Sequence, residues 1–190
     1  MKKRFMIFIA WMLCIQGIPV FAETGQVVSG DYTYIVEDEK AVIISYNGSE
    51  SDVKIPDKLD GYPVIEISMG FCLSKQGVRT VVIPYGVERL GSSAFERFPD
   101  LVSVTIPDSV TTIERQAFKD CASLTSITIP ESVTTIEVDA ITNCDNLTVA
   151  TVNSNILGND MFGGCNALTT VYLNGALTEI PESAFYACTS

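Results

Sequence analysis

Apolar and polar residues repeat along most of the chain with a period of 23 residues. Residues 101–123, LVSVTIPDSVTTIERQAFKDCAS, and residues 124–146, LTSITIPESVTTIEVDAITNCDN, share one pattern, and residues 78–100 carry it one period earlier. The apolar residues alternate over 103–106, which predicts a half-buried strand that ends at a proline. A second short extended piece is predicted over 110–113, and AFKDC at 117–121 predicts a brief helical or irregular turn.

One unit of this pattern cannot bury both of its faces, but stacked units can. Weaker units extend the array: residues 147–167 are two residues short and carry Asn153 in place of the proline, and residues 168–190 return to full length. We therefore expect an elongated solenoid whose coils stack at about 4.8 Å. Its narrow core is expected to hold the apolar positions of each unit, which in residues 101–123 are Leu101, Val104, Ile106, Val110, Ile113, Phe118 and Cys121.

The segments outside the clean repeats also have distinct patterns. Two alternating apolar runs at 32–36 and 41–46 flank a polar turn at 37–40, which predicts a β-hairpin. We expect residues 23–54 to form an N-terminal cap over the open end of the solenoid, and residues 55–190 to form the solenoid itself. The chain stops at Ser190, one residue before the next expected leucine, so either it is truncated at the C-terminus or its last coil has no cap.

Residues 1–22 have the pattern of a secretory signal peptide. Lys2, Lys3 and Arg4 precede an apolar run over 5–20, and the small residue Ala22 offers a cleavage site. A retained membrane span is less favoured, because a glutamine, a glycine and a proline interrupt the apolar run. We expect export to the cell surface or medium, with no membrane insertion after cleavage.

Charge and composition exclude several classes of function. The chain has 12 basic and 23 acidic residues among 190, and without residues 1–22 its net charge is −14, which disfavours nucleic acid as a partner. The absence of histidine excludes Ser/His/Asp and Cys/His catalysis and His-bearing zinc sites. A carboxylate hydrolase is disfavoured, because Asp108 and Glu131 are copies of one repeat position. We predict no catalytic residue, cofactor or metal, and hence no enzyme.

Four cysteines occupy one repeat position. Cys121, Cys144, Cys165 and Cys188 are spaced 23, 21 and 23 residues apart, and Phe98 holds the same position one unit earlier. We predict a column of small buried side chains, because stacked side chains point in parallel and are poorly placed for disulfides. With Cys72, five cysteines remain after signal cleavage, so at least one is unpaired within a monomer.

The outward positions of the first strand form two further columns. Thr80, Ser103, Ser126, Val149 and Thr170 make one column, and Val82, Thr105, Thr128, Thr151 and Tyr172 make the other. An exposed sheet face of this kind is a common recognition surface in solenoids. The alternative is that threonine is there only because it suits a solvated strand. The candidate binding residues are Ser103, Thr105, Ser126, Thr128, Thr151, Thr170 and Tyr172.

The repeat resembles the BspA-type leucine-rich repeat, which occurs in bacterial surface proteins. The resemblance rests on IPDSVTTI at 106–113, Ala117, Phe118, Cys121 and Leu124, and covers residues 55–190, departing from the pattern at Asn153 and Asn174. It implies a β-rich α/β solenoid of leucine-rich repeats. It also implies a non-catalytic secreted or cell-surface protein that adheres to an extracellular protein or cell-surface ligand. The alternative function is a structural spacer presenting a downstream domain that is absent from this chain.

Overall fold

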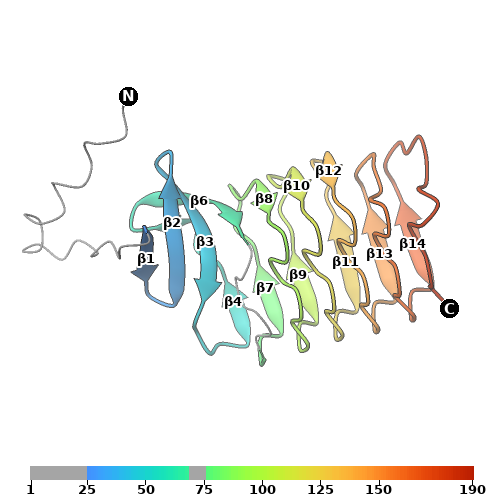
Figure 1. The fold of residues 1–190 in the computed structure, drawn as a ribbon, viewed down its shortest axis with the longest axis horizontal. Coiled ribbons are helices and arrows are strands. Elements are labelled where there is room, and N and C mark those ends of the chain that lie inside the picture. Colours follow the sequence, from blue (N-terminus) through green and yellow to red (C-terminus); the bar gives the residue numbers. More distant parts are fainter. Residues whose placement is uncertain (1–24, 69–75) are drawn as a thin grey trace, which may run out of the picture.

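The computed structural model describes residues 25–68 and 76–190, which form an elongated stack of coils (Figure 1). The described residues contain fourteen strands and no helix. The predicted signal peptide, residues 1–22, and Cys72 lie outside the described residues.

The N-terminal part is a small antiparallel unit. β1 (Gln26–Ser29) pairs with β2 (Tyr32–Glu37), and β2 pairs with β3 (Lys40–Tyr46) through the predicted turn. The buried Tyr34 hydroxyl donates to Asp60 at 2.9 Å, and the Ser29 hydroxyl donates to the same carboxylate at 2.9 Å. These bonds tie the hairpin to the first coil, while its role as a cap stays a prediction.

One sheet continues from this hairpin along the stack. β3 pairs in parallel with β6 (Tyr62–Ile67), which also pairs with the short β5 (Lys58–Leu59). The second strands of successive coils follow in parallel: β8 (Arg89–Leu90), β10 (Thr112–Ile113) and β12 (Thr135–Ile136). Leu90, Ile113 and Ile136 are direct partners across these strands, so the 23-residue period is the register of the sheet.

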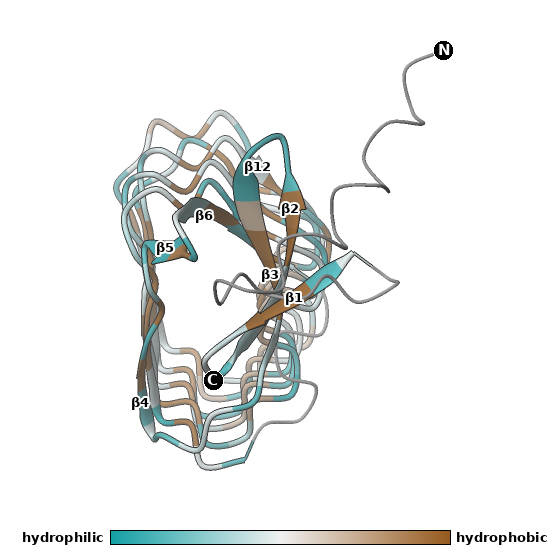
Figure 2. Ribbon diagram, turned by 90° about the vertical axis from the view of Figure 1, so that its left-hand side faces the viewer, coloured by the Kyte–Doolittle hydropathy of each residue, from teal (hydrophilic) through white to brown (hydrophobic). Residues whose placement is uncertain are grey.

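The first strands of the coils form the other wall. β4 (Asp52–Lys54), β7 (Thr80–Val82) and β9 (Ser103–Thr105) pair in parallel, as do β11 (Ser126–Ile129), β13 (Val149–Val152) and β14 (Thr170–Leu173). The Thr125 amide donates to the Val102 carbonyl at 3.3 Å and connects the two groups. Seen along the stack, the coils superpose around one interior (Figure 2), which the buried apolar side chains fill.

The core agrees with the repeat pattern. Five of the seven predicted core residues of residues 101–123 are fully buried, and Val104 and Ile106 pack against them partly buried. The rings of Phe95 and Phe118 stack at 5.2 Å with an interplanar angle of 6°. Phe162 and Phe185 stack in the same way at 5.7 Å. Both pairs join side chains from neighbouring coils, so the aromatic positions bind the coils together.

The turns after the second strands are irregular, and the α/β part of the predicted fold class is not confirmed. Corresponding residues of four turns have left-handed backbone: Ser93, Gln116, Asp139 and Asp160, with φ between 51° and 61°. Backbone amides there donate to the next coil, as from Phe95 to Ala117 at 2.7 Å. A helix would direct these amides to carbonyls of its own segment instead. The solenoid is therefore hydrogen-bonded along this side as well.

The shortened unit changes the wall of second strands. Beyond β12, the described residues form no further second strand. In this coil the backbone passes very close to the preceding one: a Cβ on Gly158 would lie 2.9 Å from Cγ2 of Ile136. Gly91, at the same position of a full-length unit, approaches the preceding coil as closely, with its Cβ position 3.0 Å from Cα of Ser68. Across the deletion β13 keeps its register with β11.

Candidate binding face

Strand pairing within β11 to β14, and the backbone bond from Thr125 to Val102 that joins β9 to this group, bring the seven candidate binding residues onto one face. Thr128, Thr151 and Tyr172 are direct partners across β11, β13 and β14, while Ile127 and Ala150 between the outward positions are buried. Five candidates are exposed, namely Ser103, Thr105, Ser126, Thr128 and Tyr172, and two are half-buried, namely Thr151 and Thr170. The face is therefore continuous and open to solvent.

The face extends further toward the N-terminus than the sequence predicts. Asp52 pairs with Thr80, and Lys54 with Val82, which places both charged residues at the end of the two columns. The Thr80 hydroxyl donates to the Asp52 carboxylate at 2.6 Å, and this bond together with one from Ser51 lowers the pKa of Asp52. Asp52 precedes Thr80 by 28 residues, so the 23-residue period does not assign it to this column.

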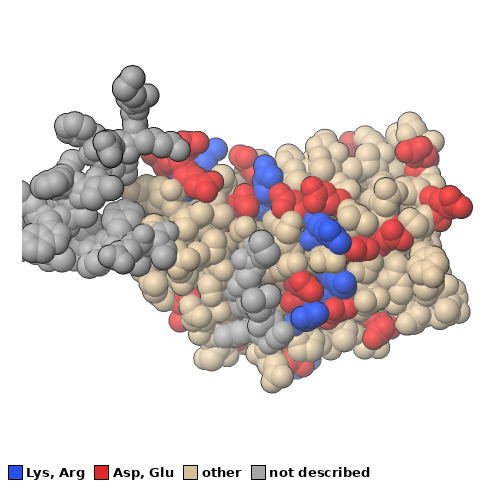
Figure 3. Space-filling view, viewed as in Figure 1, with Lys and Arg blue, Asp and Glu red and all other residues tan. Residues whose placement is uncertain are grey.

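Charge is distributed unevenly over the molecule. From β7 to β14 the two outward columns contain hydroxyl, aliphatic and one aromatic side chain, and no ionisable acid or base other than Tyr172. Acidic and basic side chains gather instead over the stacked turns and the edge near β8 to β12, where both signs are mixed (Figure 3). From β7 to β14 the candidate face is thus uncharged, although the protein is strongly acidic.

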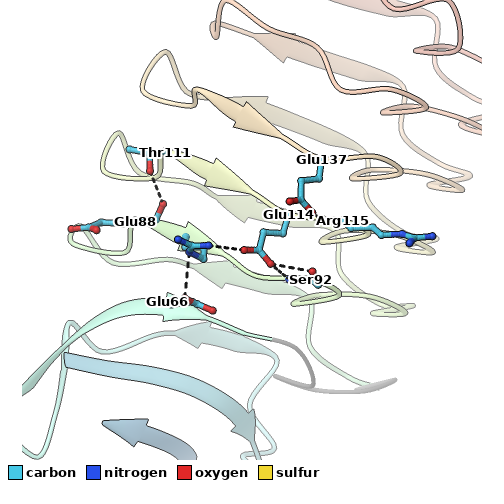
Figure 4. Close-up of polar contacts among 8 residues, drawn as sticks. Glu66, Glu88, Ser92, Thr111, Glu114, Arg115 and Glu137 are labelled. Atoms are coloured by element: carbon cyan, nitrogen blue, oxygen red, sulfur yellow. Dashed lines mark hydrogen bonds and ion pairs between the residues drawn. The ribbon is translucent and has the colours of Figure 1, made fainter. Parts of the chain in front are cut away.

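The edge carboxylates connect neighbouring coils. Arg89 lies between Glu66 at 3.4 Å and Glu114 at 2.8 Å (Figure 4). Glu114 also accepts hydrogen bonds from the amide and the hydroxyl of Ser92, both at 3.0 Å. Glu137 repeats the arrangement one coil later and accepts from the amide of Arg115 at 3.0 Å. The sequence alone does not reveal these contacts, because the partners belong to other coils.

The pKa values of Glu66 and Glu114 are shifted in opposite directions. Burial raises the pKa of Glu66, and Arg89 only partly offsets this effect. Burial would also raise the pKa of Glu114, but the hydrogen bonds from Arg89 and Ser92 outweigh it and hold this pKa below its usual value. These carboxylates lie in a row along the stack. Within residues 25–68 and 76–190, no three histidine, cysteine or acidic side chains are grouped so as to hold a metal ion.

The cysteine column lies in the core, as predicted. Cys121, Cys144 and Cys165 are fully buried and Cys188 is half-buried. Each thiol donates to a backbone carbonyl of the preceding coil at 3.1–3.2 Å, for example Cys144 to Phe118. The neighbouring thiol of the column, together with burial, raises the pKa of Cys144 and Cys165, and burial raises that of Cys188. Such thiols are poor nucleophiles, and their redox state stays a prediction.

In the part of the chain that the structure describes, no helix has the length and apolar character needed to cross a membrane.

The stacked parallel strands and the repeat define the class of leucine-rich repeat solenoids. A protein-family model described as a BspA type leucine rich repeat region matches residues 66–190 in six copies, so the chain belongs to this family and the predicted resemblance is confirmed. No curated protein matches the chain significantly.

Solved structures have the same fold. The leucine-rich repeat protein TpLRR of T. pallidum is 23% identical, with a TM-score of 0.61 over 80% of this chain and 81% of that one. A leucine-rich repeat protein of Bacteroides capillosus is 24% identical, with a TM-score of 0.60 over 80% and 99%. One from Bacteroides ovatus is 26% identical, with a TM-score of 0.59 over 84% of this chain but only 50% of that one.

Proposed function

We propose that this protein is a non-catalytic binding module, exported to the bacterial surface or medium, that binds an extracellular protein or cell-surface ligand. The ligand would contact the outward face of β7 to β14. Membership in the BspA-type family and the signal-like start of the chain support export and binding. The main structural support for the proposal is the regular, exposed and uncharged face of β7 to β14.

The chemistry of this face suits a protein ligand. Short hydroxyl side chains offer both donors and acceptors and lose little rotamer freedom on binding. Tyr172 is 55% exposed and Val82 is 38% exposed, which provides an aromatic and an aliphatic contact within the polar array. Tyrosine is enriched among residues that dominate binding energy. The face also avoids the desolvation of charge that the stacked turns would require.

Charge introduced on the face tests the proposal. The double variant Thr105→Lys with Thr128→Lys is expected to abolish capture by immobilised extracellular-matrix proteins, measured by surface plasmon resonance. The matched control is Thr111→Lys with Thr134→Lys, which adds the same charge to exposed threonines of the same two coils outside the face. Both variants should keep the wild-type circular dichroism.

Two outcomes contradict the proposal in different ways. Undiminished capture by the Thr105/Thr128 variant would place the binding site elsewhere on the coils. Absence of capture by the unaltered protein, across matrix proteins and bacterial surface extracts, would favour the spacer function instead.

A further inference from the structure

A hollow of about 220 Å³ lies on the side of the stacked turns, away from the candidate binding face. It arises where two adjacent repeat positions lose their side chains. At the first of these positions, earlier coils carry Glu96, Lys119 and Thr142, whereas this coil has Gly163. The second position of this coil is Gly164. The neighbouring coils keep side chains at the first position, so the hollow lies beside the pair of glycines.

The residues that line the hollow include an aromatic residue and residues with hydrogen-bonding side chains of both kinds. Tyr186, 72% exposed, borders it from the last coil. Asp139 and Asp160 are the acidic residues of its lining, and Lys119 is the basic residue. The Asn143 amide nitrogen donates to Asp120 at 3.0 Å, which leaves its oxygen toward Gly164: a Cβ there would lie 2.5 Å from that oxygen.

We propose that this hollow binds one neutral sugar residue of a glycan. Hydroxyl groups donate and accept hydrogen bonds, so a sugar can use carboxylates, an amide oxygen and an ammonium together. The C–H face of a sugar ring can pack on the exposed Tyr186 ring and bury apolar surface there. The hollow is smaller than the roughly 300–1,000 Å³ of sites for drug-sized ligands, which fits a single sugar unit.

Other ligand classes fit the same lining less well. A cationic side chain would be attracted by Asp139 and Asp160 but repelled by Lys119. An anionic sugar would meet two carboxylates on an acidic protein. An apolar ligand would have to desolvate three charged side chains without pairing them. The inference is independent of the proposed function, because it concerns another side of the molecule.

The test is an NMR titration of the full chain with six neutral sugars: glucose, galactose, mannose, fucose, N-acetylglucosamine and N-acetylgalactosamine. At least one sugar should shift the amide signals of Gly163 and Gly164 in a saturable manner, with a dissociation constant in the millimolar range expected for a small open site. Tyr186→Ala removes the ring and should weaken this binding about tenfold or more. Tyr85→Ala is the matched control, since Tyr85 is also highly exposed but lies outside the hollow.

A second variant addresses the hollow itself. Gly163→Gln restores a side chain where other coils carry glutamate, lysine or threonine, so the fold should persist while the hollow is filled. Its Cβ would lie 3.3 Å from the Asp160 carbonyl oxygen, a contact that needs only a small adjustment. Loss of sugar binding in Gly163→Gln, with unchanged circular dichroism, supports the site.

Three results would overturn the proposal. The first is that none of the six sugars shifts the signals of the hollow. The second is that binding survives both Tyr186→Ala and Gly163→Gln. The third is that arginine methyl ester, used as a cationic probe, saturates the hollow while the sugars do not, which would make it a site for basic side chains.

Discussion

The stacked phenylalanine pair makes Phe118→Ala an informative substitution. Phe118 is fully buried, and its ring lies parallel to that of Phe95 at 5.2 Å in the neighbouring coil. Truncation of a buried phenylalanine costs about 3–5 kcal/mol, depending on how far the surroundings collapse. Collapse is restricted here, because the backbone amides of Phe95 and Phe118 are bonded to the next coil at 2.7 Å and 2.8 Å. We therefore expect the upper part of that range.

This loss would be a large fraction of the roughly 5–15 kcal/mol by which most domains are stable. For a chain of this size it corresponds to a decrease in Tm of roughly 6–20 °C. Urea unfolding followed by far-UV circular dichroism measures it, with an unchanged m-value showing that the comparison is valid. Because each coil contacts only its neighbours, the coils on both sides should loosen together.

Two control variants isolate the buried ring. Phe185→Ala makes the same chemical change at a partly buried site and should cost clearly less. Thr105→Ala, on the exposed face, should change stability by no more than about 0.5 kcal/mol. A loss below about 1 kcal/mol for Phe118→Ala, or one equal to that of Phe185→Ala, would refute the reasoning, since it would show that the coils close over the vacated space.

The further predictions concern three topics: charge, thiols and processing. Glu114→Gln should destabilise the protein at about pH 7 and progressively less toward about pH 3, because a carboxyl of lowered pKa stabilises the fold only while ionised. Glu66→Gln should have the opposite sign near neutral pH, because the pKa of Glu66 is raised, and it too should lose its effect in acid. Native thiols should label slowly, and unfolding should expose close to five thiols in the chain without residues 1–22. Edman sequencing of secreted protein should begin at Glu23, and loss of Trp11 should leave only tyrosine fluorescence.

Each of these has a contrary result. A Glu114→Gln penalty as large in acid as at neutral pH would mean that the carboxylate acts by packing and not by charge. Complete failure to label under denaturing, non-reducing conditions would show that the cysteines are oxidised or modified. A secreted protein that still begins at Met1 or Lys2 would contradict signal cleavage.

The repeat explains why so much of the fold could be predicted from the sequence. Each structural position occurs in several copies, so Ile113 and Cys121 could be assigned to core columns by comparison with their counterparts. The period then fixed the register, because parallel in-register pairing is how identical coils bury their apolar faces. The same logic placed the candidate binding residues on one face, although it could not identify a ligand.

Other features depend on contacts that do not follow the period. Arg89 and Glu114 are 25 residues apart, so comparison of the repeat units at their 23-residue period does not pair them. Asp52 in β4 precedes its partner Thr80 in β7 by 28 residues, so the period did not predict that β4 joins this wall. The left-handed turn positions are held by serine, glutamine and aspartate alike, because the path of the solenoid and not the residue type requires that conformation. The Gly163–Gly164 pair stands in the sequence where other units carry side chains, but only the stacked coils show the hollow beside it.

The direction of the hydrogen bonds between coils has a mechanical consequence. Successive coils are joined by bonds that run along the long axis, and β1 and β14 lie at opposite ends of that axis (Figure 1). A pull on the two ends therefore loads the outermost coil first and opens its bonds one after another, as in unzipping, while the remaining coils stay intact. Each released unit of 23 residues lengthens the chain by up to about 80 Å. Under a stretching force the solenoid would thus lengthen in discrete steps.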